Sequence, residues 1–193
     1  TPEVFWNLRI NYAKNLNKVL SLAGEQKVLV LDESRLRTAW ITAEVGKPYG
    51  TIWGYRYLRD AQGRIVHDAS GLPMRDPERA ILGRGTPDWT AGFSSEVGYK
   101  NLSLSLLIDV KWGGQLFSGT NAYAYIYGLH KNTLKGRAEC DAAGYPTAGC
   151  MVGEGVTPNG QPNTVKVLPE AYYGRIGAQI AEEFVYDANF IKL

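Results

Sequence analysis

The chain has 193 residues, and its 45% hydrophobic and 21% charged residues are ordinary values for a folded protein. The formal net charge is only +2 and the lysines and arginines are scattered, which excludes the basic surface typical of nucleic-acid-binding proteins. No apolar run is long enough for a membrane-spanning helix, but a barrel strand needs only about 9–11 residues with one apolar face. Abundant aromatic residues and 22 glycines favour strands and turns over helices.

The first strong pattern is an alternating strand at residues 4–15, VFWNLRINYAKN. One face would hold Trp6, Leu8, Ile10 and Tyr12, opposite polar side chains. Weaker strand patterns follow along residues 27–60. We expect residues 38–68 to form a hairpin outside the membrane, so that residues 16–87 add no spanning strand.

Residues 60–76, DAQGRIVHDASGLPMRD, predict a tight turn, a three-residue strand and a second turn. Asp60, Asp68 and Asp76 are attributed to turn chemistry, because the acidic spacing of a calcium-binding loop is absent.

Two further alternating strands follow, at residues 88–99 and 102–112. The two residues between them, Lys100 and Asn101, predict an antiparallel hairpin, and Asn101 tolerates a positive φ. Leu107 is an exception on the otherwise polar face of the last strand. The opposite face is apolar throughout and holds Leu102, Leu104, Leu106, Ile108, Val110 and Trp112.

The stretch 115–187 has no comparable strand and is expected to be a long loop carrying short helices at residues 129–140 and 178–187. Glu182 and Glu183 are expected to be solvated rather than catalytic, because adjacent residues diverge on a helix. Loop aromatic residues could face a substrate or a covering protein, although loop packing is favoured for the cluster at 123–127. These aromatic residues are Trp40, Tyr49, Trp53 and Tyr123–Tyr127.

Cys140 and Cys150 are separated by nine residues between turn-forming segments and could close a small disulfide. Two free thiols, the usual state in a cytosolic protein, remain the alternative. A zinc site is not expected, because no CxxC motif is present and neither His67 nor His130 is placed to complete one. No metal or cofactor is therefore predicted.

Long strands, one two-residue turn, very long loops and aromatic residues at strand ends together indicate the fold class. We expect an all-β chain whose antiparallel strands form part of a transmembrane β-barrel, with long extracellular loops carrying minor helix. The alternative is a soluble β-sandwich whose apolar face packs on a second sheet.

Four segments carry a family resemblance: residues 5–22, 46–66, 81–120 and 186–193. The block from Gly83 to Ser105 is the most specific. Their order resembles the C-terminal part of the SusC/RagA family of TonB-linked (TonB-dependent) outer-membrane transporters. The resemblance implies a plugged 22-stranded barrel in the lipid of the bacterial outer membrane. It also implies an oligosaccharide or peptide substrate, a SusD-like surface lipoprotein as partner, and energy from the TonB complex through an N-terminal part.

Residues 1–193 are accordingly expected to be one partial TonB-dependent receptor barrel domain, a fragment without the plug and TonB box. The start at Thr1 and the interrupted alternation at the end agree with this expectation. The predicted function is a segment of a glycan or peptide importer. An exported, soluble, β-rich carbohydrate-binding module without catalysis is the alternative. We expect no enzyme, because no nucleophile–base pair or phosphate-binding glycine loop stands out, and no catalytic, cofactor-binding or substrate-binding residue is assigned.

Overall fold

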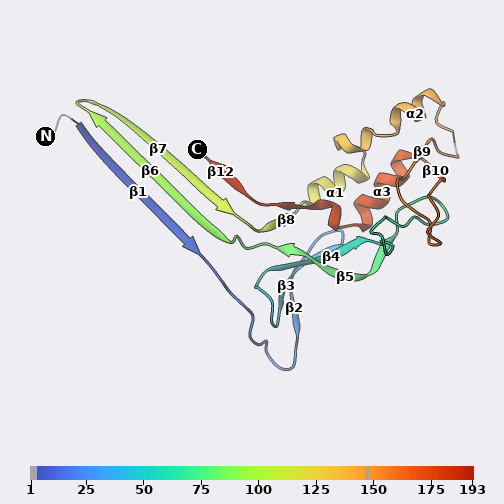
Figure 1. The fold of residues 1–193 in the computed structure, drawn as a ribbon, viewed down its shortest axis with the longest axis horizontal. Coiled ribbons are helices and arrows are strands. Elements are labelled where there is room, and N and C mark those ends of the chain that lie inside the picture. Colours follow the sequence, from blue (N-terminus) through green and yellow to red (C-terminus); the bar gives the residue numbers. More distant parts are fainter. Residues whose placement is uncertain (1–3, 147) are drawn as a thin grey trace.

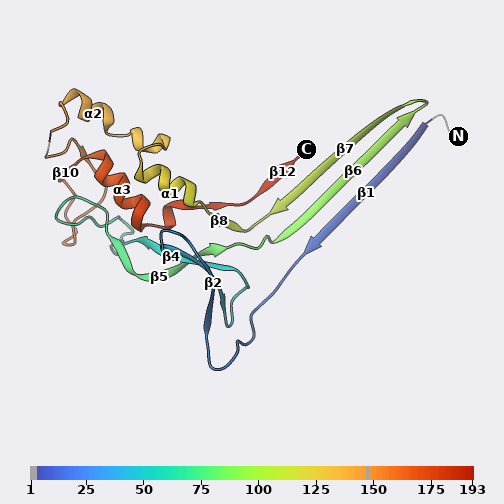
Figure 2. The same ribbon diagram turned by 180° about the vertical axis from the view of Figure 1, so that it is seen from behind.

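The structure is a computed structural model that describes residues 4–146 and 148–193. A long arm of strands projects from a lobe of sheet and helices, and the two views of the ribbon agree on this shape (Figures 1 and 2). None of the helices in the described residues is long and apolar enough to cross a membrane.

The arm is one antiparallel sheet in the order β1-β6-β7-β12. β1 pairs with β6 along its whole length, so residues 15–88 add no strand to this sheet, as expected. β6 and β7 form the predicted hairpin, with Trp89 opposite Trp112 and Tyr99 opposite Leu102. The sheet is open, so a closed barrel stays a prediction. Its strands are β1 (Val4–Lys14), β6 (Trp89–Tyr99), β7 (Leu102–Trp112) and β12 (Phe190–Lys192).

The hairpin turn differs from expectation in one backbone angle. The positive φ, 52°, is at Lys100 and not at Asn101. A positive φ at the first of the two central residues is the pattern of a type II′ turn, which matches the twist of the flanking strands.

A second antiparallel sheet, in the order β2-β3-β4-β5, forms part of the lobe. The β3–β4 pair confirms the expected hairpin, but two more strands flank it. The strand pattern in β5 is weak because the strand contains Pro77. This proline lies where the pairing of β4 and β5 shifts register, so no backbone N–H is needed there for a hydrogen bond between the strands. The strands are β2 (Val28–Glu33), β3 (Ala39–Glu44), β4 (Thr51–Tyr57) and β5 (Arg75–Arg84).

The helices pack mainly on one another, and η2 contacts β4 of this sheet. The helix expected within residues 129–140 is present as η1 and α2. The helix expected at 178–187 is present only in part, as the end of α3 and as η2, and the range ends in the strand β11. α3 itself begins earlier, at Pro169. Proline suits the first helical turn because its missing N–H has no intrahelical acceptor there. The helices are α1 (Gly119–Ile126), η1 (Lys131–Leu134), α2 (Arg137–Ala142), α3 (Pro169–Gln179) and η2 (Glu182–Phe184).

Four short strands complete the lobe. They form two antiparallel pairs, β8 with β11 and β9 with β10. Their bounds are β8 (Gln115–Phe117), β9 (Met151–Val152), β10 (Lys166–Val167) and β11 (Val185–Asp187).

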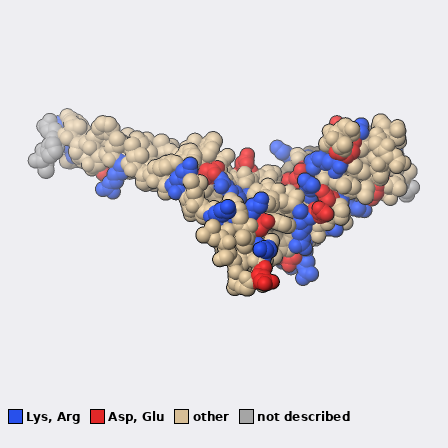
Figure 3. Space-filling view, turned by 60° about the horizontal axis from the view of Figure 1, so that its bottom comes forward, with Lys and Arg blue, Asp and Glu red and all other residues tan. Residues whose placement is uncertain are grey.

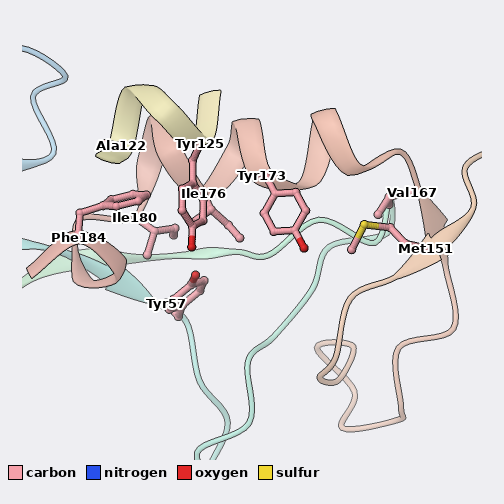
Figure 4. Close-up of a cluster of buried hydrophobic side chains, with 9 residues drawn as sticks. All are labelled: Tyr57, Ala122, Tyr125, Met151, Val167, Tyr173, Ile176, Ile180 and Phe184. Atoms are coloured by element: carbon pink, nitrogen blue, oxygen red, sulfur yellow. The ribbon is translucent and has the colours of Figure 1, made fainter. Parts of the chain in front are cut away.

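The buried core lies in the lobe, where α1, α3 and η2 meet the end of β4 (Figure 4). Gly177 of α3 allows the two helices to approach closely, because a Cβ there would lie 2.5 Å from the carbonyl oxygen of Ala122 in α1. The cluster holds Tyr57, Ala122, Tyr125, Met151, Val167, Tyr173, Ile176, Ile180 and Phe184.

Candidate functional site

One face of the arm is apolar across all of its strands. The register places Trp6, Val97 and Leu104 in one row and Ile10, Phe93 and Ile108 in another. In β12, Ile191 lies opposite Val110 and extends the same face. Leu102 and Leu104 are 77% and 73% exposed, and nothing in the described part of the chain covers them. Apart from Ser95 and Lys14, this face therefore presents an apolar surface to the surroundings.

The other face of the arm is polar. Asn7 donates a hydrogen bond to Glu96 across the β1–β6 pair, with 3.4 Å from Nδ2 to Oε2. Leu107 lies on this face opposite Ser94 and is exposed, so it remains the exception noted in the sequence. The division into an apolar and a polar face is as predicted.

Aromatic side chains gather at the end of the apolar face nearest the lobe. The rings of Trp89 and Trp112 stack with centroids 6.1 Å apart, and Tyr12 lies 5.9 Å from Trp89. Towards the hairpin turn, the indole N–H of Trp6 donates to the hydroxyl of Ser95 over 3.0 Å. Ser95 interrupts the apolar face, and this bond satisfies its hydroxyl oxygen.

Charged side chains are unevenly distributed between the two parts of the molecule. In the space-filling view they are sparse along the arm and crowded over the lobe (Figure 3). An arm of low charge next to a charged lobe is the distribution expected where one part contacts hydrocarbon and the other contacts water.

The lobe aromatic residues singled out in the sequence are not gathered into one site. Trp40 is buried, donates its indole N–H to Glu33 over 2.9 Å and lies beneath the guanidinium of Arg79. Trp53 is half-buried and Tyr49 is exposed. None of these three lines the largest cleft of the described residues.

The cluster at 123–127 divides between core and surface. Tyr125 is buried and packs edge-on against Phe184, as the packing interpretation expects, and it also lines the largest cleft. Tyr123 and Tyr127 stack on one another along α1, and Tyr127 is exposed.

The largest cleft lies in the lobe beside α3 and has a volume of about 780 Å³. Four separate stretches of the chain build it, which is why no single motif predicts it. Its apolar side comes from Tyr172, Tyr173 and Ile176. Its polar and charged lining comprises Arg64, Lys131, Asn132, Lys135, Glu154 and Glu183.

Glu183 is not solvated as expected. It accepts hydrogen bonds from two separate parts of the lobe. Its two carboxylate oxygens accept hydrogen bonds from the hydroxyls of Tyr57, over 2.9 Å, and Tyr125, over 3.0 Å. Those two hydroxyls point toward one another across the core (Figure 4). Glu182 is also engaged, since it accepts from the backbone N–H of Tyr57 and from Arg59.

Burial changes the ionisation of the tyrosines around the cleft. Burial, followed by the negative charge of Glu183, raises the pKa of Tyr57. Burial also raises the pKa of Tyr125 and that of Tyr172 to about 12 each. The raised pKa values extend the protonated state of these hydroxyls to higher pH, and the hydroxyls of Tyr57 and Tyr125 donate to Glu183.

Asp60 and Asp68 have the turn role predicted for them. Asp60 accepts from the backbone of Gln62 and Arg64, and the side chain of Arg64 helps lower the pKa of Asp60. Asp68 accepts from the backbone of Ser70 and Leu72. Asp76 does not lie in a turn as predicted but in β5, where it accepts from the N–H of Glu78 and pairs with Arg56.

The cysteines lie side by side, with Cα atoms 5.1 Å apart, and are joined as a disulfide in the structure. Whether the protein carries this bridge in solution stays a prediction. His67 is fully buried and stacks on Tyr172, and burial lowers its pKa. Within the described ranges no group of three or more potential ligands gathers to hold a metal ion.

Comparison with known proteins points to one class. No family model matches the chain. The TonB-dependent receptor P3 of Formosa agariphila is 26% identical over 211 residues, which cover 97% of the chain and 19% of that receptor. The chain thus spans about a fifth of the length of this relative. This similarity supports the resemblance to TonB-dependent receptors that was seen in the sequence. The SusC/RagA subfamily and the position within the receptor stay predictions.

Proposed function

We propose that the chain is part of the wall of a TonB-dependent importer, with the arm crossing the bacterial outer membrane and the lobe outside the cell. Residues 1–193 would then be one partial barrel domain, whose plug and TonB box belong to other parts of the protein. In this arrangement the apolar face contacts lipid and the polar face lines the lumen.

The arm's exposed apolar face is the observation that carries this proposal. Three adjacent strands have 11 residues each, and a tilted barrel strand needs about 9–11 to cross the hydrocarbon core. In water so large an apolar surface would drive aggregation, whereas in a bilayer it is the low-energy arrangement. The stacked Trp89 and Trp112 fit the aromatic girdle found at membrane interfaces.

The proposal extends to cargo and partners on the strength of the family resemblance. The importer would take up oligosaccharides, or peptides, delivered with a SusD-like lipoprotein over the lobe, and would draw energy from the TonB complex. It would have no catalytic activity of its own. The comparison with the receptor of Formosa agariphila supports the transport class.

Spin labels on β7 of the complete transporter in liposomes test the arrangement. Labels at positions 104 and 106 should be accessible to oxygen, which dissolves in lipid, and labels at 105 and 107 to a water-soluble nickel chelate. Position 107 is the matched control, because Leu106 and Leu107 are the same residue type on opposite faces. A lipid-accessible label at 105 or 107 would overturn the proposal. Protection of 104 and 106 from both reagents would favour the soluble carbohydrate-binding module, which needs a second sheet over this face.

A further inference from the structure

We propose that His67 is a pH-sensitive latch for the large cleft of the lobe. Protonation of its buried imidazole releases the loop of residues 153–163, which forms one wall of that cleft. The proposal goes beyond the transport function and does not depend on it, because every residue involved lies in the lobe. It rests on the backbone contacts that hold this cleft loop, on the burial of the imidazole and on its unpartnered nitrogen.

The cleft loop is held by the backbone around His67. The N–H of His67 donates to the carbonyl oxygen of Val156 over 2.7 Å, and the N–H of Val156 donates to that of Ile65 over 2.8 Å. Within the loop, the N–H of Asn163 donates to the carbonyl oxygen of Gly155 over 2.9 Å. Gly155 and Val156 both line the cleft, so these hydrogen bonds keep its wall in place.

The imidazole packs directly against the same loop. His67 is fully buried, and two glycines allow the loop to approach its ring. A Cβ at Gly153 would lie 2.6 Å from Nε2, and one at Gly155 would lie 2.7 Å from Cε1. The ring also stacks on Tyr172 of α3, with centroids 6.0 Å apart. Because the ring is packed between the loop and α3, it reaches water only when the loop moves.

This environment suits the neutral imidazole and not the charged one. Nε2 lies 3.4 Å from the hydroxyl of Tyr172, whereas Nδ1 has no hydrogen-bond partner among the described residues. Both ring nitrogens carry a hydrogen in the imidazolium, so Nδ1 would become a buried donor without an acceptor. Burial also lowers the pKa of His67, in agreement with this geometry.

The ionisable groups around the ring do not offset its burial. They are Arg64 and Asp68 of its own segment, Glu154 of the loop, and Tyr172 and Arg175 of α3. Asp68 favours the imidazolium, but its carboxylate also lies 3.7 Å from Arg175, and burial has the larger effect on the pKa of His67. Glu154 is exposed, so water screens its charge. The segment 71–74, which pairs with His67 through Pro73, has no ionisable side chain.

The lowered pKa fixes the direction of the pH effect. The pKa of His67 is below 6.5 while the loop is closed and returns towards 6.5 when the ring reaches water. The closed form is therefore most stable above pH 6.5 and loses stability as the pH falls through the lowered pKa. Since opening takes up one proton in this range, the ratio of closed to open loop should fall by up to about tenfold per pH unit.

Amide hydrogen exchange of the complete protein in detergent tests the latch. Rates are measured between about pH 5 and 8, where histidine titrates, and are divided by the rates of unstructured peptides at each pH. We expect the protection of residues 153–163 to fall as the pH is lowered. Peptides from β3 and β4, which lie outside the cleft lining, are the internal reference and should keep their protection.

Two variants separate the latch from other effects of acid. His67→Phe keeps a ring against Tyr172 but cannot be charged, so the protection of the loop should no longer depend on pH. His130→Phe is the matched control, because it changes the other histidine of the chain and should leave the wild-type pH dependence intact.

A third variant changes the pKa of His67 itself. Asp68→Asn removes a charge that favours the imidazolium, but it keeps the side-chain oxygen that accepts from the N–H groups of Ser70 and Leu72. Exchange of the ring C2 hydrogen, followed by mass spectrometry, gives the pKa of each histidine. That of His67 should lie below 6.5 in the wild type and lower still in Asp68→Asn.

Three results would overturn the proposal: loop protection that does not change with pH, an equal change in His67→Phe, or a wild-type pKa of His67 at or above 6.5. If His67→Phe leaves the loop unprotected at every pH, Asp68→Asn decides. A further fall in the pKa of His67 supports the latch, and an unchanged pKa rejects it. The spin labels on β7 report on the arm alone, so the membrane arrangement stands or fails separately.

Discussion

The hydroxyl of Tyr57, at the end of β4, donates to Glu183, which lies 126 residues further along the chain. The same carboxylate accepts from Tyr125 on α1. One side chain of η2 thus joins the second sheet to the helices of the lobe, on the wall of the large cleft beside α3.

Glu183→Gln should loosen the lobe. The amide keeps one acceptor oxygen, replaces the other by a donor, and leaves a tyrosine hydroxyl without its partner, at a cost of about 1–3 kcal/mol. Limited proteolysis of the complete transporter should cut the lobe faster in the variant. Glu170→Gln, at an exposed position on α3, is the matched control and should be cut at the wild-type rate.

Alkaline pH should destabilise the lobe through its buried tyrosines. The pKa of Tyr125 is raised from 10.0 to about 12, so folding favours the protonated hydroxyl. This stabilisation is fully present below pH 10 and is lost as the pH rises towards 12. The ultraviolet absorbance of tyrosinate during a pH titration should show a late step that Tyr125→Phe reduces. An unchanged late step in that variant would contradict the assignment.

Arginine substitutions at two neighbouring leucines should separate the faces of the arm. Leu106→Arg places a charge on the apolar face near the middle of β7 and should cost about 2–4 kcal/mol if that face meets lipid. Leu107→Arg places the same charge at the same depth on the polar face and should cost little. Urea unfolding of the complete transporter in liposomes measures the loss of unfolding free energy in each variant. Equal losses would count against contact of the apolar face with lipid.

A side chain at Gly98 would displace the ring of Phe5, which occupies the position of its Cβ. Gly98→Ala should force this partly exposed ring out of its rotamer, at a cost of about 0.5–1.5 kcal/mol. In the Phe5→Ala background the same substitution should cost much less. Gly174→Ala, where a Cβ meets open space, is the control for the loss of glycine itself. If the losses of stability from Gly98→Ala and Phe5→Ala simply add in the double variant, the contact between the two positions is contradicted.

The pairing of Cys140 and Cys150 can be tested by mass spectrometry. Alkylation of the denatured transporter without reductant should leave both cysteines unmodified, and reduction should allow both to react. Modification without reductant would establish free thiols. If the bridge is present, reduction should also speed proteolysis around α2, since the crosslink limits the unfolded chain.

The arm could be predicted from the sequence because its face alternation depends only on strand period. Residues 4–12, 89–99 and 102–112 each keep an apolar residue at every second position, with Ser95 as an exception that a hydrogen bond satisfies. The two-residue turn then fixes the register of β6 and β7.

The lobe could be predicted only in part. The helix α1 contains the sequence YAYI, in which β-favouring tyrosines obscure the helical pattern, and its start depends on the cap from Ser118. The cleft escaped prediction because Arg64, Lys131, Glu154 and Tyr172 meet only through tertiary packing. Glu183 carried no local sign of its role, since both of its partners are far away in the chain.

The pairing of β1 with β6 has a consequence for the order of folding. Trp6 and Ser95 are 89 residues apart in the chain, yet they bond across adjacent strands. β6 and β7 need to close only a two-residue turn, which takes microseconds, while β1 must wait for a long intervening segment to become compact. The second sheet within that segment pairs its strands in chain order, which makes the segment compact. A defect in the lobe should therefore slow the docking of β1 without changing a residue of the arm.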